Sequence, residues 1–164
     1  MLTKNFYALM RTALGKTSST VTTIENTKKT VSMNNSTWYG VFGAMNYYET
    51  NGYQYVRFGS GTTPATVNDY VLENQINSGI TVSNPSTVTT EQTDSYISWT
   101  VTFGVSALVE TTISEVGLIA KAYMSQGEAS TLVDHTVLES PITIPAGQSK
   151  QITYTIRFNY GDAV

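Results

Sequence analysis

The clearest pattern in the sequence is a strict alternation of apolar and polar residues in its last strand-like stretch, residues 151–160. A period of two places every large apolar side chain on one face of an extended strand. A second stretch, residues 96–105, repeats the alternation, and two such faces can bury each other as in antiparallel sheets. The apolar positions of the last stretch are Ile152, Tyr154, Ile156, Phe158 and Tyr160.

Further strands complete the prediction of an all-β fold, an antiparallel β-sandwich over residues 20–164. Residues 111–124 contain four almost consecutive apolar positions around Gly117, which predicts a central strand buried on both faces. Gly117 itself predicts a bulge or a close approach of backbone. Pro141 and Pro145 predict an edge segment followed by a turn. The remaining predicted strands are residues 20–25, 29–33, 76–82, 86–92 and 131–138.

The N-terminal segment, residues 1–19, predicts a short amphipathic helix and a linker. Its apolar residues recur with the 3.6-residue period of a helix, and Gly15 is placed to end it. About eleven residues is marginal for an isolated helix, so it must dock on its own sheet or on a neighbouring subunit. A membrane surface is a weaker alternative, because few basic residues accompany the stripe. Our hypothesis is docking on an adjacent subunit through Phe6, Leu9, Met10 and Leu14.

A second short helix is predicted near residues 64–74. Thr63 can serve as its N-cap and Pro64 as its first residue. The preceding glycines suggest a phosphate-binding loop, but the Lys-Ser/Thr pair that such a loop needs is missing. Asp69 and Glu73 are too few for a calcium site, so we expect solvated acids.

An aromatic segment near residues 38–56 predicts a protruding hairpin, because Asn51-Gly52 is a strong signal for a two-residue turn. One interpretation of its aromatic side chains is the stacking of sugars or bases. Core filling and contact with other subunits is the favoured one, since basic neighbours are missing. The candidates on this segment are Trp38, Tyr39, Phe42, Tyr47, Tyr48 and Tyr53.

The amino-acid composition favours some classes of function and argues against others. Only 13% of the 164 residues are charged, against a usual share of about 25%. A surface poor in charge is often one that meets other subunits, although a neutral soluble domain has the same composition. The net charge of −3 and the pI near 5.0 argue against direct nucleic-acid binding. There is no cysteine, no apolar run of membrane-spanning length and no signal-peptide pattern, so we expect a soluble protein made in the cytosol.

The sequence shows no pattern typical of an enzyme. His135 is the only histidine, and its neighbour Asp134 would point to the opposite face of a strand. No serine lies in a Gly-x-Ser-x-Gly motif, and the spacing of the acids selects no glycosidase pair. We therefore predict a non-enzyme without cofactor or metal, in which Asp134 and His135 are an exposed or hydrogen-bonded strand pair.

Three stretches together resemble small β-sandwich structural proteins of tailed bacteriophages. The first is Phe58-Gly-Ser-Gly-Thr-Thr-Pro64 running on to Asp69-Tyr70-Val71-Leu72-Glu73. The second is Ile113-Ser-Glu-Val-Gly-Leu118. The third is residues 132–138, followed by Ile142-Thr-Ile-Pro-Ala-Gly-Gln148 and the closing strand. The likeness covers residues 53–160 and lies in the order of the motifs as much as in the motifs themselves.

The resemblance implies a virion protein, made in the bacterial cytoplasm, that assembles with copies of itself and other virion proteins as a ring or symmetric oligomer. Its implied place is the neck, collar or tail. A capsid decoration or fibre-anchoring protein and a carbohydrate-binding module remain as alternatives. Arg157, on the polar face of the closing strand, completes the interface candidates.

Overall fold

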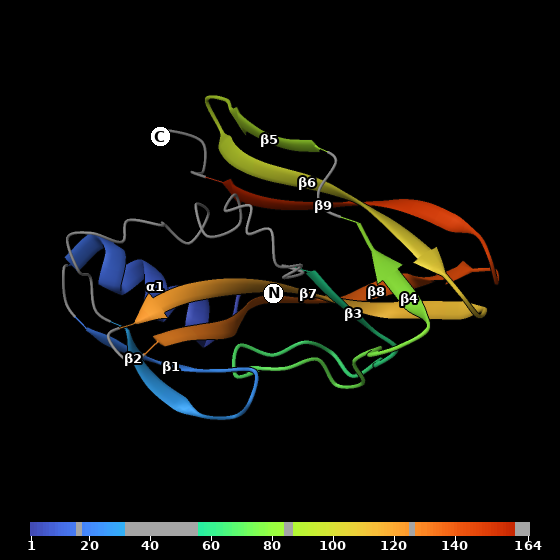
Figure 1. The fold of residues 1–164 in the computed structure, drawn as a ribbon. Helices are drawn as coiled ribbons and strands as arrows, with labels where there is room; N and C mark the ends of the chain where they lie inside the picture. Colours follow the sequence, from blue (N-terminus) through green and yellow to red (C-terminus); the bar gives the residue numbers. More distant parts are fainter. Residues whose placement is uncertain (16–17, 32–55, 84–86, 125–126, 160–164) are drawn as a thin grey trace. The chain divides into compact units, whose positions relative to one another are not determined.

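The structure is a computed structural model that describes residues 1–15, 18–31, 56–83, 87–124 and 127–159 (Figure 1). The described residues form one helix and nine strands, which confirms the predicted all-β class. Contacts divide the chain into two compact units. Unit 1 comprises Met1–Ile76 and Thr112–Ile142, and unit 2 comprises Asn77–Thr111 and Thr143–Val164.

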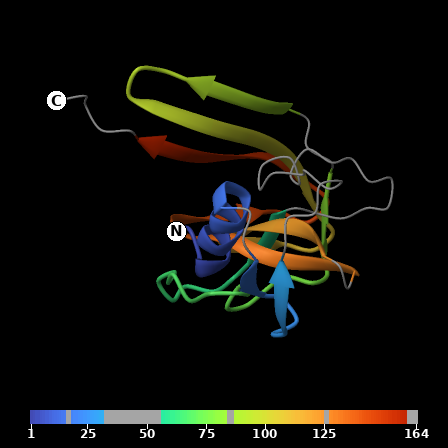
Figure 2. The ribbon, with the colours of Figure 1, turned by 90° about the vertical axis from the view of Figure 1, so that its left-hand side faces the viewer.

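Unit 2 is built on the two alternating strands, β6 (Tyr96–Ala107) and β9 (Ser149–Asn159), which pair antiparallel along almost their whole length. The register places Trp99 opposite Ile156 and Phe103 opposite Ile152. On its other side β6 pairs with β4 (Ile80–Val82) and β5 (Thr87–Gln92). Figure 2 shows β5, β6 and β9 side by side as a curved sheet. The last strand of the chain therefore pairs with the other strictly alternating stretch.

The two faces of the β6–β9 pair differ as the alternation predicts. The apolar side chains of β9 at 152, 154 and 156 are buried, as are those of β6 at 99, 101, 103 and 105. On the other face, hydroxyl groups meet across the strands, with 2.9 Å between the oxygens of Thr100 and Thr155 and 3.1 Å between those of Thr102 and Thr153. Such cross-strand pairs hold the register of the sheet.

Unit 1 contains a small hairpin and a three-stranded sheet. The hairpin joins β1 (Ser19–Thr22) to β2 (Lys28–Val31) through a turn with Asn26 at φ 58°. The sheet has the order β3-β7-β8, from strands β3 (Val56–Gly59), β7 (Thr111–Met124) and β8 (Gly127–Ile144). In β7 every residue from 113 to 120 is buried, so the prediction of a strand covered on both faces is confirmed.

Gly117, in the middle of β7, marks a close approach of two leucine side chains, where a bulge or a close approach of backbone was expected. A Cβ atom at this position would lie 2.7 Å from Cδ1 of Leu132 and 2.8 Å from Cδ2 of Leu72. Real Cβ atoms do not come so close to other carbons. The missing side chain lets Leu72 and Leu132 pack directly onto the strand, where they form a buried cluster with Ile119.

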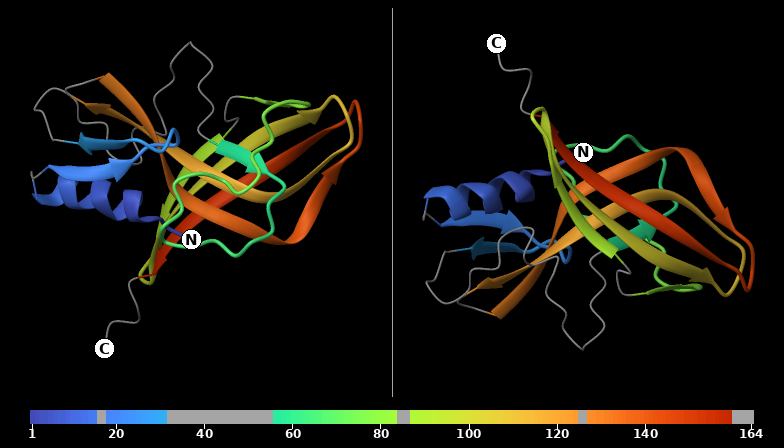
Figure 3. Two further views of the ribbon diagram at one scale, coloured as in Figure 1. Left: turned by 90° about the horizontal axis from the view of Figure 1, so that it is seen from below. Right: turned by 90° about the horizontal axis from the view of Figure 1, so that it is seen from above.

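Helix α1 (Lys4–Gly15) lies along β1 within unit 1 (Figure 3). Phe6 is 4% exposed and Leu9 is 8% exposed. The side chain of Asn5 donates to the carbonyl oxygen of Thr22 at 2.7 Å and accepts from the Thr22 amide at 2.8 Å. Phe6 and Leu9, two of the residues through which we expected the helix to dock on an adjacent subunit, are therefore buried against the helix's own unit. The contacts also do not divide the chain after residue 19, where we expected a boundary.

The predicted helix near residues 64–74 is not formed, and this segment is a series of turns. The amides of Glu73 and Asn74, which a helix over residues 64–74 would need, donate instead to the Glu115 carboxylate. Other carboxylates hold the turns before them. The Thr66 amide donates to Asp69 Oδ2 at 2.7 Å, and the amides of Thr62 and Thr63 donate to Glu73 Oε2 at 2.8 Å. Asp and Thr side chains commonly compete with helix formation in this way.

The predicted aromatic hairpin falls mostly outside the described residues. The candidates Trp38, Tyr39, Phe42, Tyr47, Tyr48 and Tyr53 all lie there, as does the side chain of Leu14.

Candidate functional site

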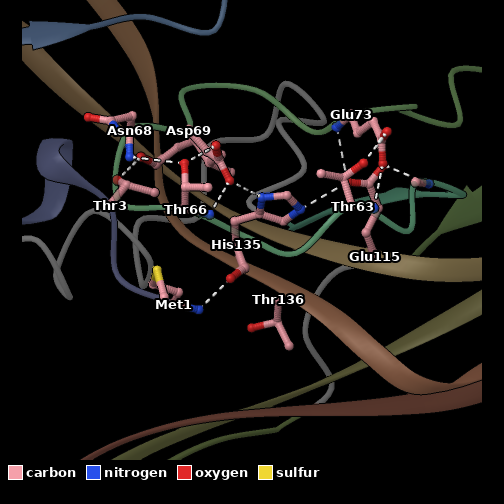
Figure 4. A network of polar contacts seen from close by, with 12 residues as sticks. Met1, Thr3, Thr63, Thr66, Asn68, Asp69, Glu73, Glu115, His135 and Thr136 are labelled. Carbon is pink, nitrogen blue, oxygen red and sulfur yellow. Dashed lines mark hydrogen bonds and ion pairs between the residues drawn. The ribbon is translucent and has the colours of Figure 1, made fainter.

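The most unusual polar group of the described residues is His135, which lies between two carboxylates. Its Nδ1 is 2.7 Å from Asp69 Oδ2, and its Nε2 is 2.9 Å from Glu115 Oε2 (Figure 4). His135 comes from β8, Glu115 from β7, and Asp69 from the turns that follow β3. His135 is 3% exposed and Glu115 is fully buried. We call Asp69, Glu73, Glu115 and His135 the buried acid network.

Glu115 binds the segment of turns to the sheet. Its Oε1 accepts hydrogen bonds from the amides of Gly61 at 3.0 Å and Asn74 at 2.7 Å. Its Oε2 accepts one from the amide of Glu73 at 3.0 Å, in addition to the contact with His135. One buried carboxylate thus satisfies three backbone donors of a segment that lacks regular structure, which is how a buried carboxylate is made tolerable.

The register of the sheet explains why this carboxylate reaches the turns. Gly59, the last residue of β3, is the partner of Glu115 in the antiparallel pair, so the chain leaves β3 directly beside the Glu115 side chain. The carboxylate occupies the space that side chains at 59 and 61 would need. A Cβ atom on Gly61 would lie 2.6 Å from Glu115 Oε1. The position of the Glu115 side chain therefore explains the two glycines of the Gly-Ser-Gly sequence. A phosphate ligand is not needed to explain them.

Both ring nitrogens of His135 are held by hydrogen bonds, one to Asp69 and one to Glu115. The Asp69 carboxylate also accepts from the Thr66 amide and the Thr66 hydroxyl. The two acids therefore fix the orientation of the imidazole ring.

Hydrogen bonds lower the pKa values of the two acids that lie on the turns. Burial raises the pKa of Asp69, but hydrogen bonds from Thr66 and His135 and the positive charge of His135 outweigh it, so the pKa lies below the ordinary 3.8. Glu73 is exposed, and the hydroxyl of Thr63 at 2.6 Å is the largest cause of the lowering of its pKa. Glu73 is exposed, as expected for a solvated acid, whereas Asp69 is half-buried, and both acids also hold turns together.

Asp134 and His135 point to opposite faces of β8, as predicted. Asp134 lies 3.1 Å from the backbone nitrogen of Met1 and accepts from the Thr136 hydroxyl at 3.0 Å. His135 is oriented instead by acids 66 and 20 residues away in the sequence. The prediction from sequence missed this arrangement, although the sequence contains one signal for it. Glu115 is a charged residue within a strand predicted to be buried on both faces, and such a residue requires partners.

The geometry of the buried acid network favours a structural role. A general base needs a ring nitrogen free to accept a proton from substrate or nucleophile, and both nitrogens of His135 face carboxylates. Within the described ranges, no group of three or more His, Cys, Asp or Glu side chains is arranged to hold a metal ion. The same ranges contain no helix long and apolar enough to cross a membrane. The absence of enzymatic activity stays a prediction.

The predicted interface residues that the structure describes belong to both units. Phe6 and Leu9 are buried in unit 1, and Met10 is half-buried. Arg157 is exposed in unit 2, where its guanidinium lies 4.1 Å from the centre of the Tyr96 ring. This is the distance of a cation–π contact, so Arg157 is ordered on the polar face of its sheet.

The lowered pKa of Asp69 predicts acid sensitivity of unit 1. A carboxyl whose pKa is lower in the folded state stabilises the fold above its unfolded value and loses this contribution as the pH falls below about 4. We expect the urea midpoint of unfolding to fall between pH 5 and about pH 2 by more in the wild type than in Asp69→Asn. Asp94→Asn, at an exposed position, is the control. An Asp69→Asn variant with the full acid dependence of the wild type would contradict the assignment.

Comparison with known proteins adds no relative to this picture, since no family model, curated protein or solved structure matches the chain.

Proposed function

We propose that this chain is a structural protein of a tailed-bacteriophage virion that assembles as a ring or symmetric oligomer in the neck, collar or tail region. The observation that carries the proposal is the convergence of the resembling motifs on Glu115. Gly61 belongs to the glycine turn, Glu73 to the acidic stretch and Glu115 to the Glu-x-Gly-Leu strand. Hydrogen bonds of 3.0 Å from the amides of Gly61 and Glu73 to the Glu115 carboxylate join the three.

This convergence supports the resemblance because hydrogen bonds to one carboxylate connect the motifs, which gives a physical reason for their occurring together. Turn chemistry and alternating strands are common, and each stretch alone is weak as a marker. A buried carboxylate that requires glycines at 59 and 61 and caps the amides of 73 and 74 links these positions to one another. A likeness over such linked positions is more specific than a likeness over independent ones.

The polar face of unit 2 also supports an assembly role. It presents paired Ser and Thr hydroxyls, with 2.7 Å between the oxygens of Ser106 and Ser149, and the guanidinium of Arg157 stacks on Tyr96. A β surface with little charge costs less to desolvate against another protein than one covered with Lys and Glu.

The test is the mass and shape of the purified full-length chain, measured by multi-angle light scattering and negative-stain electron microscopy. A closed ring or a symmetric oligomer is the expected result. Trimers would favour a capsid decoration protein. A monomer at all concentrations that binds glycans, and loses them in Tyr47→Ala and Tyr48→Ala, would overturn the proposal in favour of a carbohydrate-binding module.

A further inference from the structure

The turn between β6 and β7 presents two adjacent apolar side chains to solvent. Leu108 is 72% exposed and Val109 is 60% exposed, the highest values among the large apolar side chains of the described residues. Burying two such side chains on a partner would remove apolar surface from water and so favour association. We call Leu108, Val109 and the adjoining Glu110 the apolar turn.

Backbone hydrogen bonds hold this turn in place from two sides. The Leu108 amide donates to the carbonyl oxygen of Gly79 at 2.8 Å, and the Ala107 amide donates to that of Gln148 at 2.9 Å. The Gly147 amide returns a bond of 2.7 Å to the Ala107 carbonyl oxygen. Two other segments of unit 2, at Gly79 and at residues 147–148, therefore fix the turn, so a partner need not order it on binding. Preorganisation of this kind reduces the entropic cost of association.

Unit 1 carries a second exposed apolar patch, on the outer side of helix α1. Tyr7 is 56% exposed, and the edge of its ring packs against Phe6 with ring centres 5.5 Å apart. Val67, 37% exposed, is placed beside the start of the helix because its carbonyl oxygen accepts from the Lys4 amide at 2.7 Å. We call Lys4, Tyr7, Arg11 and Val67 the helix patch.

The two surfaces are complementary in charge. Glu110, which is exposed, adjoins the apolar pair of the turn. Lys4 and Arg11, also exposed, lie three residues before and four residues after Tyr7, which places all three along one side of the helix. The helix itself contains no acidic residue. The apolar side chains of the turn, which lie beside the negative charge of Glu110, thus match the apolar side chains of the helix patch, which lie beside the positive charges of Lys4 and Arg11.

We propose that the apolar turn of one copy of this chain docks on the helix patch of the next copy. Leu108 and Val109 pack on Tyr7 and Val67, and Glu110 pairs with Arg11 or Lys4. The proposal rests on the proposed assembly function and names the contact that would build it. Because the two surfaces differ, the contact is heterologous, and its repetition produces a ring if the rotation closes. Aromatic and apolar anchors at the centre of a contact, with charges at its rim, are the usual anatomy of an interface.

The test uses the full chain and measures self-association by sedimentation velocity over a range of concentrations. Leu108→Asp should weaken association by at least about tenfold, because it removes a central apolar anchor and buries a charge. Glu110→Arg and Arg11→Glu should each weaken it by about threefold or more through like-charge contacts. Combining the two substitutions should recover most of the loss, which a general effect on folding would not do.

Two controls make the outcome decisive. Glu139→Arg reverses an exposed acid of β8 outside both surfaces and should leave association unchanged. Circular dichroism should show that all variants remain folded, since every replaced side chain is exposed. A wild-type oligomer that Leu108→Asp leaves intact would overturn this contact while the proposed function stands. A wild-type chain that stays monomeric throughout would overturn both.

Discussion

Replacing Glu115 with alanine should destabilise unit 1 by about 3–5 kcal/mol, the range found when one partner of a buried ion pair is removed. The substitution deprives the amides of Gly61, Glu73 and Asn74 of their acceptor. It also leaves the buried side chain of His135 with Asp69 alone. Since the whole stability of a domain is about 5–15 kcal/mol, this loss should leave a substantial unfolded population at moderate temperature.

The conservative variant Glu115→Gln should lose about 1–3 kcal/mol. Its amide oxygen can still accept from two of the backbone donors, whereas its NH2 group meets a further donor. Urea unfolding followed by circular dichroism gives the free energies, and hydrogen exchange of residues 58–76 shows where the opening occurs. Exchange should accelerate in this segment and stay unchanged in Glu139→Gln, which alters an exposed acid. Wild-type stability in Glu115→Ala would contradict the role assigned to the buried acid network.

Replacing Phe6 with alanine should cost about 3–5 kcal/mol, the usual loss for a buried aromatic side chain. Phe6 is 4% exposed and anchors helix α1 within unit 1. The adjacent substitution Tyr7→Ala is a matched control, since Tyr7 is 56% exposed. It should change stability by no more than about 1 kcal/mol, which allows for the loss of its edge contact with Phe6.

The same pair of variants separates two roles of the helix. Chemical unfolding should distinguish Phe6→Ala from the wild type, and sedimentation should distinguish Tyr7→Ala. A Phe6→Ala protein with wild-type stability and lost assembly would restore the hypothesis that the apolar stripe of the helix binds a neighbouring subunit.

Local pattern predicted much of the fold. The period of two identified β6 and β9 within a few residues of their ends, and it identified their buried faces. The 3.6-residue period identified α1, and the consecutive apolar residues of β7 indicated burial on both sides. These predictions succeed because the order of apolar and polar residues within a helix or strand determines which of its faces is buried.

The partner of each element was harder to predict. The apolar stripe of α1 is equally suited to its own unit or to another subunit, since hydrophobic burial has no direction. In the structure, hydrogen bonds of Thr3 and Asn5 with Leu132 and Thr22 help to tie the helix to its own unit.

Periodicity along the chain predicts α1, β6, β7 and β9 with their buried faces, because it is a local property. The buried acid network could not be predicted in this way, because it forms only when distant segments meet. The tertiary structure placed Asp69 and Glu115 on either side of His135, and it turned residues 64–74 from a predicted helix into turns held by carboxylates. The physical reason is that a buried charge takes its partners from whatever strands and turns lie beside it, and sequence spacing does not record that neighbourhood.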